Sequence, residues 1–150
     1  MTFNFNNFFD SRNKNSKMGH FQDLEHIDGL SISTTSANLY KTRRDDLVMF
    51  YFRDGANYAS VYTQSKIVSE NIKWNRNISS KKIKALIINT RNANAFTGKE
   101  GYKSLKILAE EISSKLSEKQ NIDEEKPSKV KSSDIIFACT GTIGEKFPKD

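Results

Sequence analysis

The chain has 150 residues, of which 36% are hydrophobic and 28% charged, and its formal net charge is +6. This length supports one domain with a hydrophobic core, and no run approaches the roughly 18 apolar residues of a membrane-spanning helix. The positive charge is mainly scattered lysine, whereas nucleic-acid-binding surfaces usually cluster basic residues and interleave aromatic ones. Composition therefore predicts a protein that binds neither membrane nor nucleic acid.

The ends of the chain carry few structural signals. The N-terminus lacks a basic segment followed by an apolar one, so it does not resemble a secretory signal peptide. A single cysteine, Cys139, cannot form an internal disulfide, and both features predict a cytoplasmic protein. Residues 1–22 are rich in Asn and Phe without a regular period, which predicts a flexible arm before one domain at 23–150.

The first part of the domain predicts β-strands. Alternation favours a short strand over 26–33, and the apolar run at 47–52 is typical of a strand covered on both faces. The Asp-Gly pair at 54–55, followed by a β-rich run at 56–63, predicts a hairpin. A third apolar strand is expected over 82–90.

The second part predicts a helix and one more strand. Thr97 and Glu100 have the spacing of a capping box. The helix would end near residue 117, and a charged connection at 118–131 would lead to a strand at 133–139. Its apolar face would consist of Leu105, Leu108, Ile112 and Leu116. This order of elements predicts an α/β domain with layers of sheet and helix.

The asparagine-rich stretch NTRNANAFTGKEG at 89–101 joins the third predicted strand to the helix. We expect its Asn side chains to bond the local backbone, as in many polar loops. The alternative is a helix N-terminus whose free amides face a ligand. The stretch is not a phosphate-binding P-loop, because the Gly-x4-Gly-Lys-Ser/Thr spacing is absent.

Cys139 is the chain's one thiol, and a nucleophilic role would require a nearby base. The two histidines, His20 and His26, lie in a poorly patterned region with nothing to bring them to it. A cysteine ending an apolar strand is expected to be a small buried hydrophobe. These residues also lack metal-ligand spacing, so we expect no metal and no cofactor.

Thr140 and Gly141 follow the last predicted strand and place a hydroxyl donor beside an unhindered backbone amide. Two converging donors can stabilise the oxyanion of an acyl-transfer reaction. By spacing alone, a simple turn is the more frequent reason for such a pair.

Two segments resemble the ornithine acetyltransferase family of arginine biosynthesis. IINTRNANAFTGKEGYKS at 87–104 is similar to its Asn-Ser-Gly-Asn-Ala-Asn-Ala-Cys-Thr-Gly segment. ACTGTIGEKFPKD at 138–150 is similar to its Ser-Thr-Gly-Val-Ile-Gly-Glu-x-x-Pro segment. The resemblance covers about residues 27–150, with Arg91 replacing a usual Gly and Phe96 a usual Cys.

The resemblance implies a glutamate N-acetyltransferase with a self-cleaving, N-terminal-nucleophile-like fold, incomplete in this chain. Such precursors cut themselves before a threonine, which then carries acetyl from N-acetylornithine to glutamate; some members also accept acetyl-CoA. The family's oxyanion-stabilising pair falls on Thr140 and Gly141, and its nucleophile would lie beyond Asp150. The chain would be an N-terminal part of the α portion, inactive alone, within an α2β2 heterotetramer of α and β chains.

Two alternatives remain beside the function that the resemblance implies. One is part of a related self-cleaving aminopeptidase, which shares the nucleophile chemistry but not these segments. The other is a basic module that binds nucleic acid, for which salt-sensitive oligonucleotide binding would be the sign.

Overall fold

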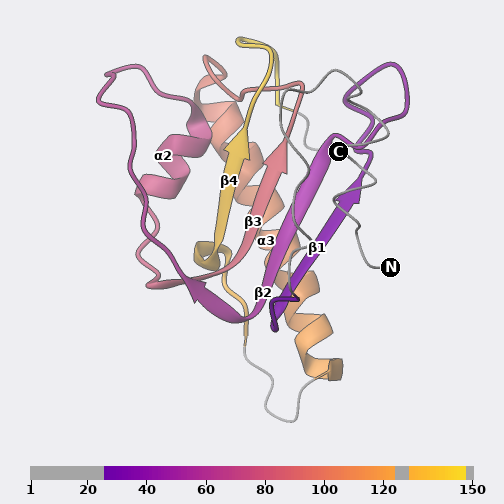
Figure 1. The fold of residues 1–150 in the computed structure, drawn as a ribbon. Helices are drawn as coiled ribbons and strands as arrows, with labels where there is room; N and C mark the ends of the chain where they lie inside the picture. The colour runs from indigo at the N-terminus through magenta and orange to yellow at the C-terminus, as the bar shows by residue number, and fades with distance from the viewer. Residues whose placement is uncertain (1–25, 124–128, 148–150) are drawn as a thin grey trace, which may run out of the picture.

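A computed structural model describes residues 26–123 and 129–147, and the arm predicted at 1–22 lies outside them. Their elements are β1 (Leu30–Thr35), β2 (Leu47–Asn57), α2 (Glu70–Arg76), β3 (Lys82–Asn89), α3 (Gly98–Asp123), the 3-10 turn η1 (Ser132–Asp134) and β4 (Ile135–Cys139). The strands form one sheet in the order β1-β2-β3-β4 (Figure 1). β1, β2 and β3 pair antiparallel, and β4 runs parallel to β3. The predicted α/β class is confirmed.

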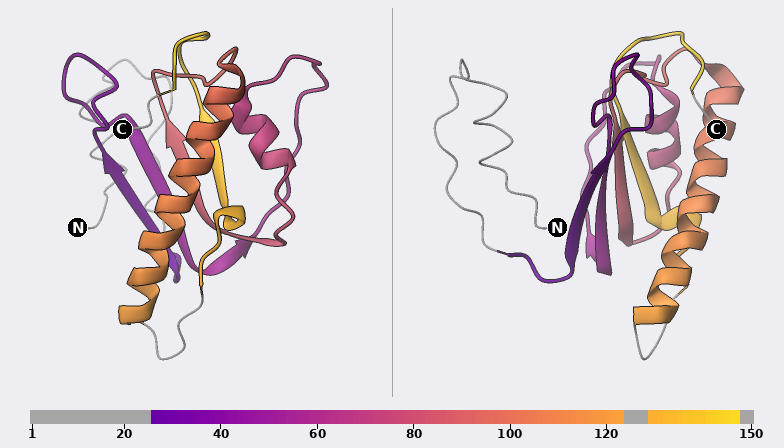
Figure 2. Two further views of the ribbon diagram at one scale, coloured as in Figure 1. Left: turned by 180° about the vertical axis from the view of Figure 1, so that it is seen from behind. Right: turned by 90° about the vertical axis from the view of Figure 1, so that its right-hand side faces the viewer.

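The hydrophobic core lies between the sheet and the helices, which pack on the same face of the sheet (Figure 2). Trp74 of α2 packs edge-on against Phe137 of β4, and its indole N–H donates to the Ile135 carbonyl at 2.9 Å. The predicted apolar face of α3 is confirmed, because Leu105 and Leu116 are buried in this core. Burying each such large side chain stabilises the fold by about 1.5–3 kcal/mol.

No described element covers the opposite face of the sheet. Cross-strand pairing places one apolar residue from each strand in a row across it: Ile32, Phe50, Leu86 and Ile136. All four are partly exposed. The prediction that the strand at 47–52 is covered on both faces is therefore wrong for the described residues.

The hairpin predicted at residues 54–55 is also wrong. β2 continues through this pair to Asn57, with a register shift between Tyr51 and Ala56 against β3. Gly55 has a φ of +73°, so the glycine that would suit a turn here accommodates a bulge within one strand. Residues 58–63, expected to form the second strand of the hairpin, have no strand structure.

The helices differ from the prediction in number and length. α2 has only 7 residues, too few to show a helical period in the sequence. α3 extends to Asp123, so the first part of the connection predicted at 118–131 is helical. Gln120 anchors this extension, since its buried amide donates to the Tyr51 hydroxyl at 2.9 Å and to the Arg53 carbonyl at 3.0 Å.

The outer edge of β4 is closed by a side chain instead of a strand. The Asn75 amide accepts from the Phe137 N–H at 3.0 Å and donates to the Phe137 carbonyl at 2.8 Å. This pairing satisfies an edge peptide that would otherwise be open to another chain. It also fixes β4 just before the loop that follows the strand. None of the helices in the part of the chain described here could span a membrane.

Candidate functional site

The parallel strands β3 and β4 end side by side, where Asn89 pairs with Cys139. Two loops leave this edge: the asparagine loop (residues 90–97) and the Thr-Gly loop (residues 140–147), both at the top of Figure 1. The carboxyl edge of parallel strands is where α/β sheets usually bind ligands. The backbone bonds that join the segments are Thr140 N to Asn89 O, Thr142 N to Arg91 O, Ala93 N to Thr142 O and Gly144 N to Ala95 O.

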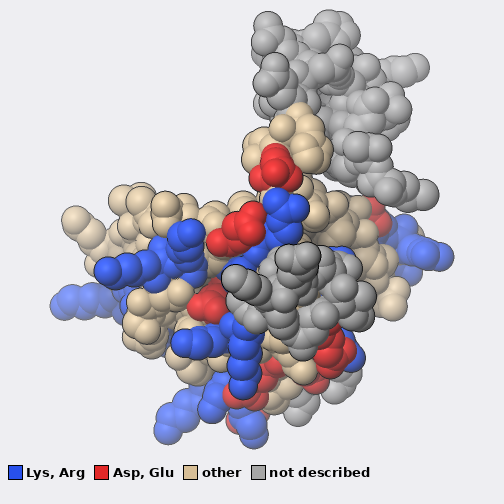
Figure 3. All heavy atoms as spheres, turned by 90° about the horizontal axis from the view of Figure 1, so that it is seen from below, with Lys and Arg blue, Asp and Glu red and all other residues tan. Residues whose placement is uncertain are grey.

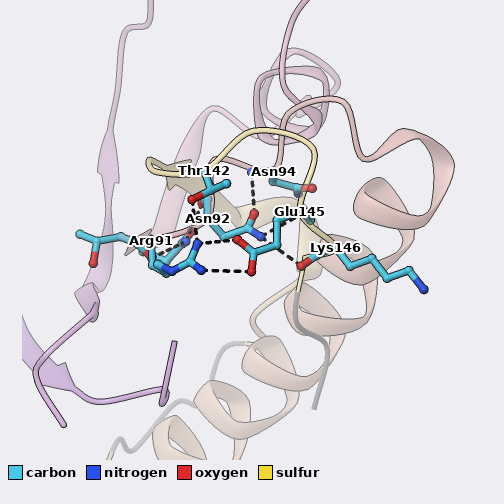
Figure 4. A network of polar contacts seen from close by, with 8 residues as sticks. Arg91, Asn92, Asn94, Thr142, Glu145 and Lys146 are labelled. Atoms are coloured by element: carbon cyan, nitrogen blue, oxygen red, sulfur yellow. Dashed lines mark hydrogen bonds and ion pairs between the residues drawn. The ribbon is translucent and has the colours of Figure 1, made fainter. Parts of the chain in front are cut away.

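Buried asparagine side chains form the scaffold of both loops. The Asn92 amide donates to the carbonyls of Glu145 at 3.2 Å and Lys146 at 3.0 Å, and its Oδ1 accepts from the Asn94 N–H at 2.8 Å (Figure 4). The Asn89 amide donates to the Asn92 carbonyl at 2.8 Å. The prediction that these side chains bond the backbone is confirmed, and two of the bonds reach the other loop.

Asn94 joins the asparagine loop to the first turn of α3. Its side chain has no exposed surface, donates to the Gly101 carbonyl at 3.2 Å and accepts from the Thr97 hydroxyl at 2.6 Å. Gly101 fits tightly here, because an added Cβ would lie 2.7 Å from the Thr97 Cβ and collide with the Asn94 side chain. The predicted capping box is wrong: in the described residues, no hydrogen bond joins the Thr97 or Glu100 side chain to the helix amides.

Thr140 and Gly141 begin the Thr-Gly loop and are exposed. Within the described residues, the Thr140 hydroxyl and the Gly141 amide have no hydrogen-bond partner. Gly141 has a φ of +134°, and a Cβ there would collide with the carbonyl group of Arg91 and lie 2.6 Å from Asn92 N. The loop thus presents two unpaired neighbouring donors on a backbone that is packed closely from behind.

Arg91 and Phe96, the two departures noted in the asparagine loop, both have positive φ, +79° and +57°. The Arg91 guanidinium donates to the Thr142 hydroxyl at 2.7 Å and forms an ion pair with Glu145 (Figure 4). Phe96 is 70% exposed and, together with Phe147, lines a hollow in the surface. Sequence reasoning did not single out Glu145.

Cys139 lies at the end of β4 and packs against the core, as expected of a small hydrophobe. Burial raises the pKa of its thiol to about 12, which opposes the thiolate that a nucleophile needs. Of the histidines, His26 is exposed and His20 lies outside the described residues. In residues 26–123 and 129–147, no group of three or more His, Cys, Asp or Glu could hold a metal ion.

The raised pKa of Cys139 predicts a thiol that resists modification. At pH 8 we expect an aromatic disulfide reagent to react at least 100-fold faster in urea than in the native chain, since reactivity follows the thiolate fraction. The unfolded thiol ionises near pH 9 while the native thiol keeps its proton, so stability should fall as pH rises from about 9 toward 12. Cys139→Ala should lack that decline. Equal reaction rates in both states would contradict the prediction.

The pattern of the ArgJ family matches residues 31–150, which is most of the chain. The chain belongs to the ArgJ family. The resemblance identified from residues 27–150 is therefore confirmed. Among similar proteins, the arginine biosynthesis bifunctional protein ArgJ of Nitrobacter winogradskyi is 33% identical over 82% of this chain. That of Mesorhizobium japonicum is 32% identical over 79% of it.

Solved ArgJ-type structures share the fold. The Bacillus halodurans ArgJ protein gives a TM-score of 0.66 at 24% identity, with 82% of this chain and 59% of that one covered. An ornithine acetyltransferase from Mycobacterium tuberculosis, complexed with ornithine, gives 0.70 at 22% identity, with 82% and 61% covered. The chain spans 28% of the Nitrobacter protein and 26% of the Mesorhizobium protein, so it corresponds to a minor part of these relatives.

Proposed function

We propose that this ArgJ-family chain forms part of the active site of a glutamate N-acetyltransferase of arginine biosynthesis, and that Thr140 and Gly141 supply its oxyanion hole. The observation that carries the proposal is the pair of unpaired donors at the carboxyl edge of β3 and β4. The pair lies inside the segment that matches the family. Membership of the family supports the acetyltransferase class, and the ornithine complex of the Mycobacterium protein supports an ornithine-type substrate.

The proposed reaction has two steps. A threonine hydroxyl, supplied from outside this chain, attacks the acetyl carbonyl of N-acetylornithine as its proton passes to a base. The carbonyl oxygen becomes an oxyanion, to which the Thr140 hydroxyl and the Gly141 N–H donate. The C–N bond breaks, ornithine leaves with a proton, and an acetyl-threonine remains. The amine of glutamate then attacks the ester carbonyl and forms a second oxyanion. The C–O bond to the threonine breaks, a proton from the amine passes to the threonine oxygen, and N-acetylglutamate leaves.

The remaining parts of the proposal concern the whole enzyme. The threonine would arise by self-cleavage of a precursor, and this chain would be an N-terminal part of the resulting α portion. It would assemble with the rest of the α portion and the β chain into an α2β2 heterotetramer in the cytoplasm. Acetyl-CoA would be an additional acetyl donor, not a bound cofactor. Without the nucleophile, the chain alone would not turn over N-acetylornithine.

The nucleic-acid alternative gains no support from the surface. On the face shown in Figure 3, Lys and Arg side chains are interspersed with Asp and Glu. Within the chain, Arg53 pairs with Asp28 and Asp54, and Lys115 pairs with Glu118. Basic side chains that are paired with carboxylates in this way do not form the continuous positively charged groove that binds single-stranded nucleic acid.

Thr140→Ala tests the proposed role directly. In a complete enzyme that carries these residues, we expect kcat for acetyl transfer to fall by about 10²-fold or more, because one oxyanion donor is lost. Stability should change little, since the side chain is exposed and has no partner in the described residues. Thr140→Ser keeps the hydroxyl and is the matched control, with most activity retained. Unchanged kinetics in Thr140→Ala would remove the residue from the site.

A further inference from the structure

Arg91 has an unfavourable backbone conformation for its residue type. Its φ of +79° lies in the left-handed region, where a side chain other than glycine costs conformational free energy. Such residues persist when the surrounding structure holds them in place, and they occur often at functional sites. The contacts of Arg91 therefore indicate what this conformation stabilises.

Those contacts all lead to the Thr-Gly loop. The Arg91 carbonyl accepts from the Thr142 N–H at 2.8 Å, and its carbonyl group packs against Gly141. Its guanidinium donates to the Thr142 hydroxyl at 2.7 Å. It also donates to both carboxylate oxygens of Glu145, with Nη2 3.2 Å from Oε1 (Figure 4). One residue thus contacts the loop at three positions, from the backbone and from the side chain.

We propose that Arg91 is a positioning residue which, through Thr142 and Glu145, fixes the direction of the Thr140 and Gly141 donors. The two-pronged contact of a guanidinium with a carboxylate sets orientation as well as distance, which a lysine cannot reproduce. Because Thr142 directly follows Gly141, holding its hydroxyl and its amide restricts the peptide next to both donors. The catalytic part of this inference rests on the function proposed for them.

The ion pair is not positioned to contribute much to global stability. The side chains of Arg91 and Glu145 are 35% and 45% exposed, and solvent weakens such pairs strongly. Other bonds also hold the loop, including those from Asn92 and the one from Gly144 to Ala95. Removal of the Arg91 side chain should therefore loosen the loop locally and leave the sheet intact.

Amide hydrogen exchange of the chain tests the positioning role without requiring activity. In Arg91→Gly, glycine accepts the positive φ, so folding is preserved while the guanidinium is lost. We expect exchange at Thr142 and Gly144 to accelerate at least about 5-fold, and exchange at Ile87 in β3 to stay unchanged. Glu145→Gln should act in the same direction. Lys115→Gln, which removes a surface pair on α3, is the matched control and should alter neither.

Kinetics of a complete enzyme that carries these residues provide the second test. We expect Arg91→Gly to lower kcat about 10-fold with little change in KM. Arg91→Lys should have a kcat between that of Arg91→Gly and that of the original enzyme. Unchanged loop exchange in Arg91→Gly would overturn the positioning role, as would unchanged kcat alongside an inactive Thr140→Ala. Full activity in Thr140→Ala would overturn the proposed function, while faster loop exchange in Arg91→Gly would still support the hold of Arg91 on the loop.

Discussion

Replacing Gly141 with alanine should destabilise the fold by about 2–4 kcal/mol and abolish acetyl transfer in a complete enzyme. The added Cβ would collide with the Arg91 carbonyl group and come within 2.6 Å of Asn92 N. These are backbone atoms held by strand-end hydrogen bonds, so they cannot rotate away as a flexible side chain would. The Thr-Gly loop would have to separate from the asparagine loop, displacing the proposed oxyanion donors.

Gly144 provides a matched control in the same loop. Its φ is +79°, but an added Cβ would meet nothing within 4 Å. Gly144→Ala should therefore cost only the conformational strain of a left-handed alanine, about 1–2 kcal/mol. Thermal or urea unfolding of both variants measures the difference. If Gly141→Ala is no less stable than Gly144→Ala, the close packing behind the donors is not the constraint that the structure indicates.

Long apolar segments allowed part of this fold to be predicted from sequence. The strands at β3 and β4 and the helix α3 were all located, because each buries a continuous or periodic set of apolar residues. The Asp-Gly pair at 54–55 led to the wrong prediction of a hairpin, because a glycine with positive φ suits a bulge as well as a hairpin. α2 is short and was missed, although its Trp74 and Asn75 hold the edge of β4.

Only those residues of the site that stand in a short sequence motif could be predicted. Thr140 and Gly141 stand together in the sequence and could be identified from their types and from the resemblance. The contact of Arg91 with Glu145 joins residues 54 positions apart and depends on the parallel pairing of β3 with β4. The register of those strands could not be predicted from the sequence, so nothing in the sequence indicated that the two side chains lie together.

The buried position of Asn94 predicts a large and pH-dependent effect for Asn94→Asp. The new carboxylate would lose the donor to the Gly101 carbonyl, now 3.2 Å from Nδ2, and bring a charge to a site with no exposed surface. The Thr97 hydroxyl could still donate to this carboxylate, but one hydroxyl does not compensate a buried charge, and an uncompensated buried charge costs about 3–5 kcal/mol. We expect a loss of that size at pH 7, measured by urea unfolding against the parent chain.

The pH dependence follows from which state holds the proton more tightly. Burial would raise the pKa of the introduced carboxyl in the folded chain, whereas the unfolded one titrates near pH 4. As pH rises above about 4, the unfolded chain releases this proton first, so the variant loses stability relative to the parent. At lower pH the protonated carboxyl can donate to Gly101, and the difference should shrink.

Asn38 supplies the control for charge and backbone conformation. It also has a positive φ, +57° against +47° for Asn94, but it is exposed. Asn38→Asp should change stability by less than about 0.5 kcal/mol, as surface substitutions usually do, with no comparable pH dependence. A similarly small effect for Asn94→Asp would mean that the asparagine loop rearranges at little cost in free energy. That result would also weaken the case for a rigid support behind the two donors, because the same loop packs against Gly141.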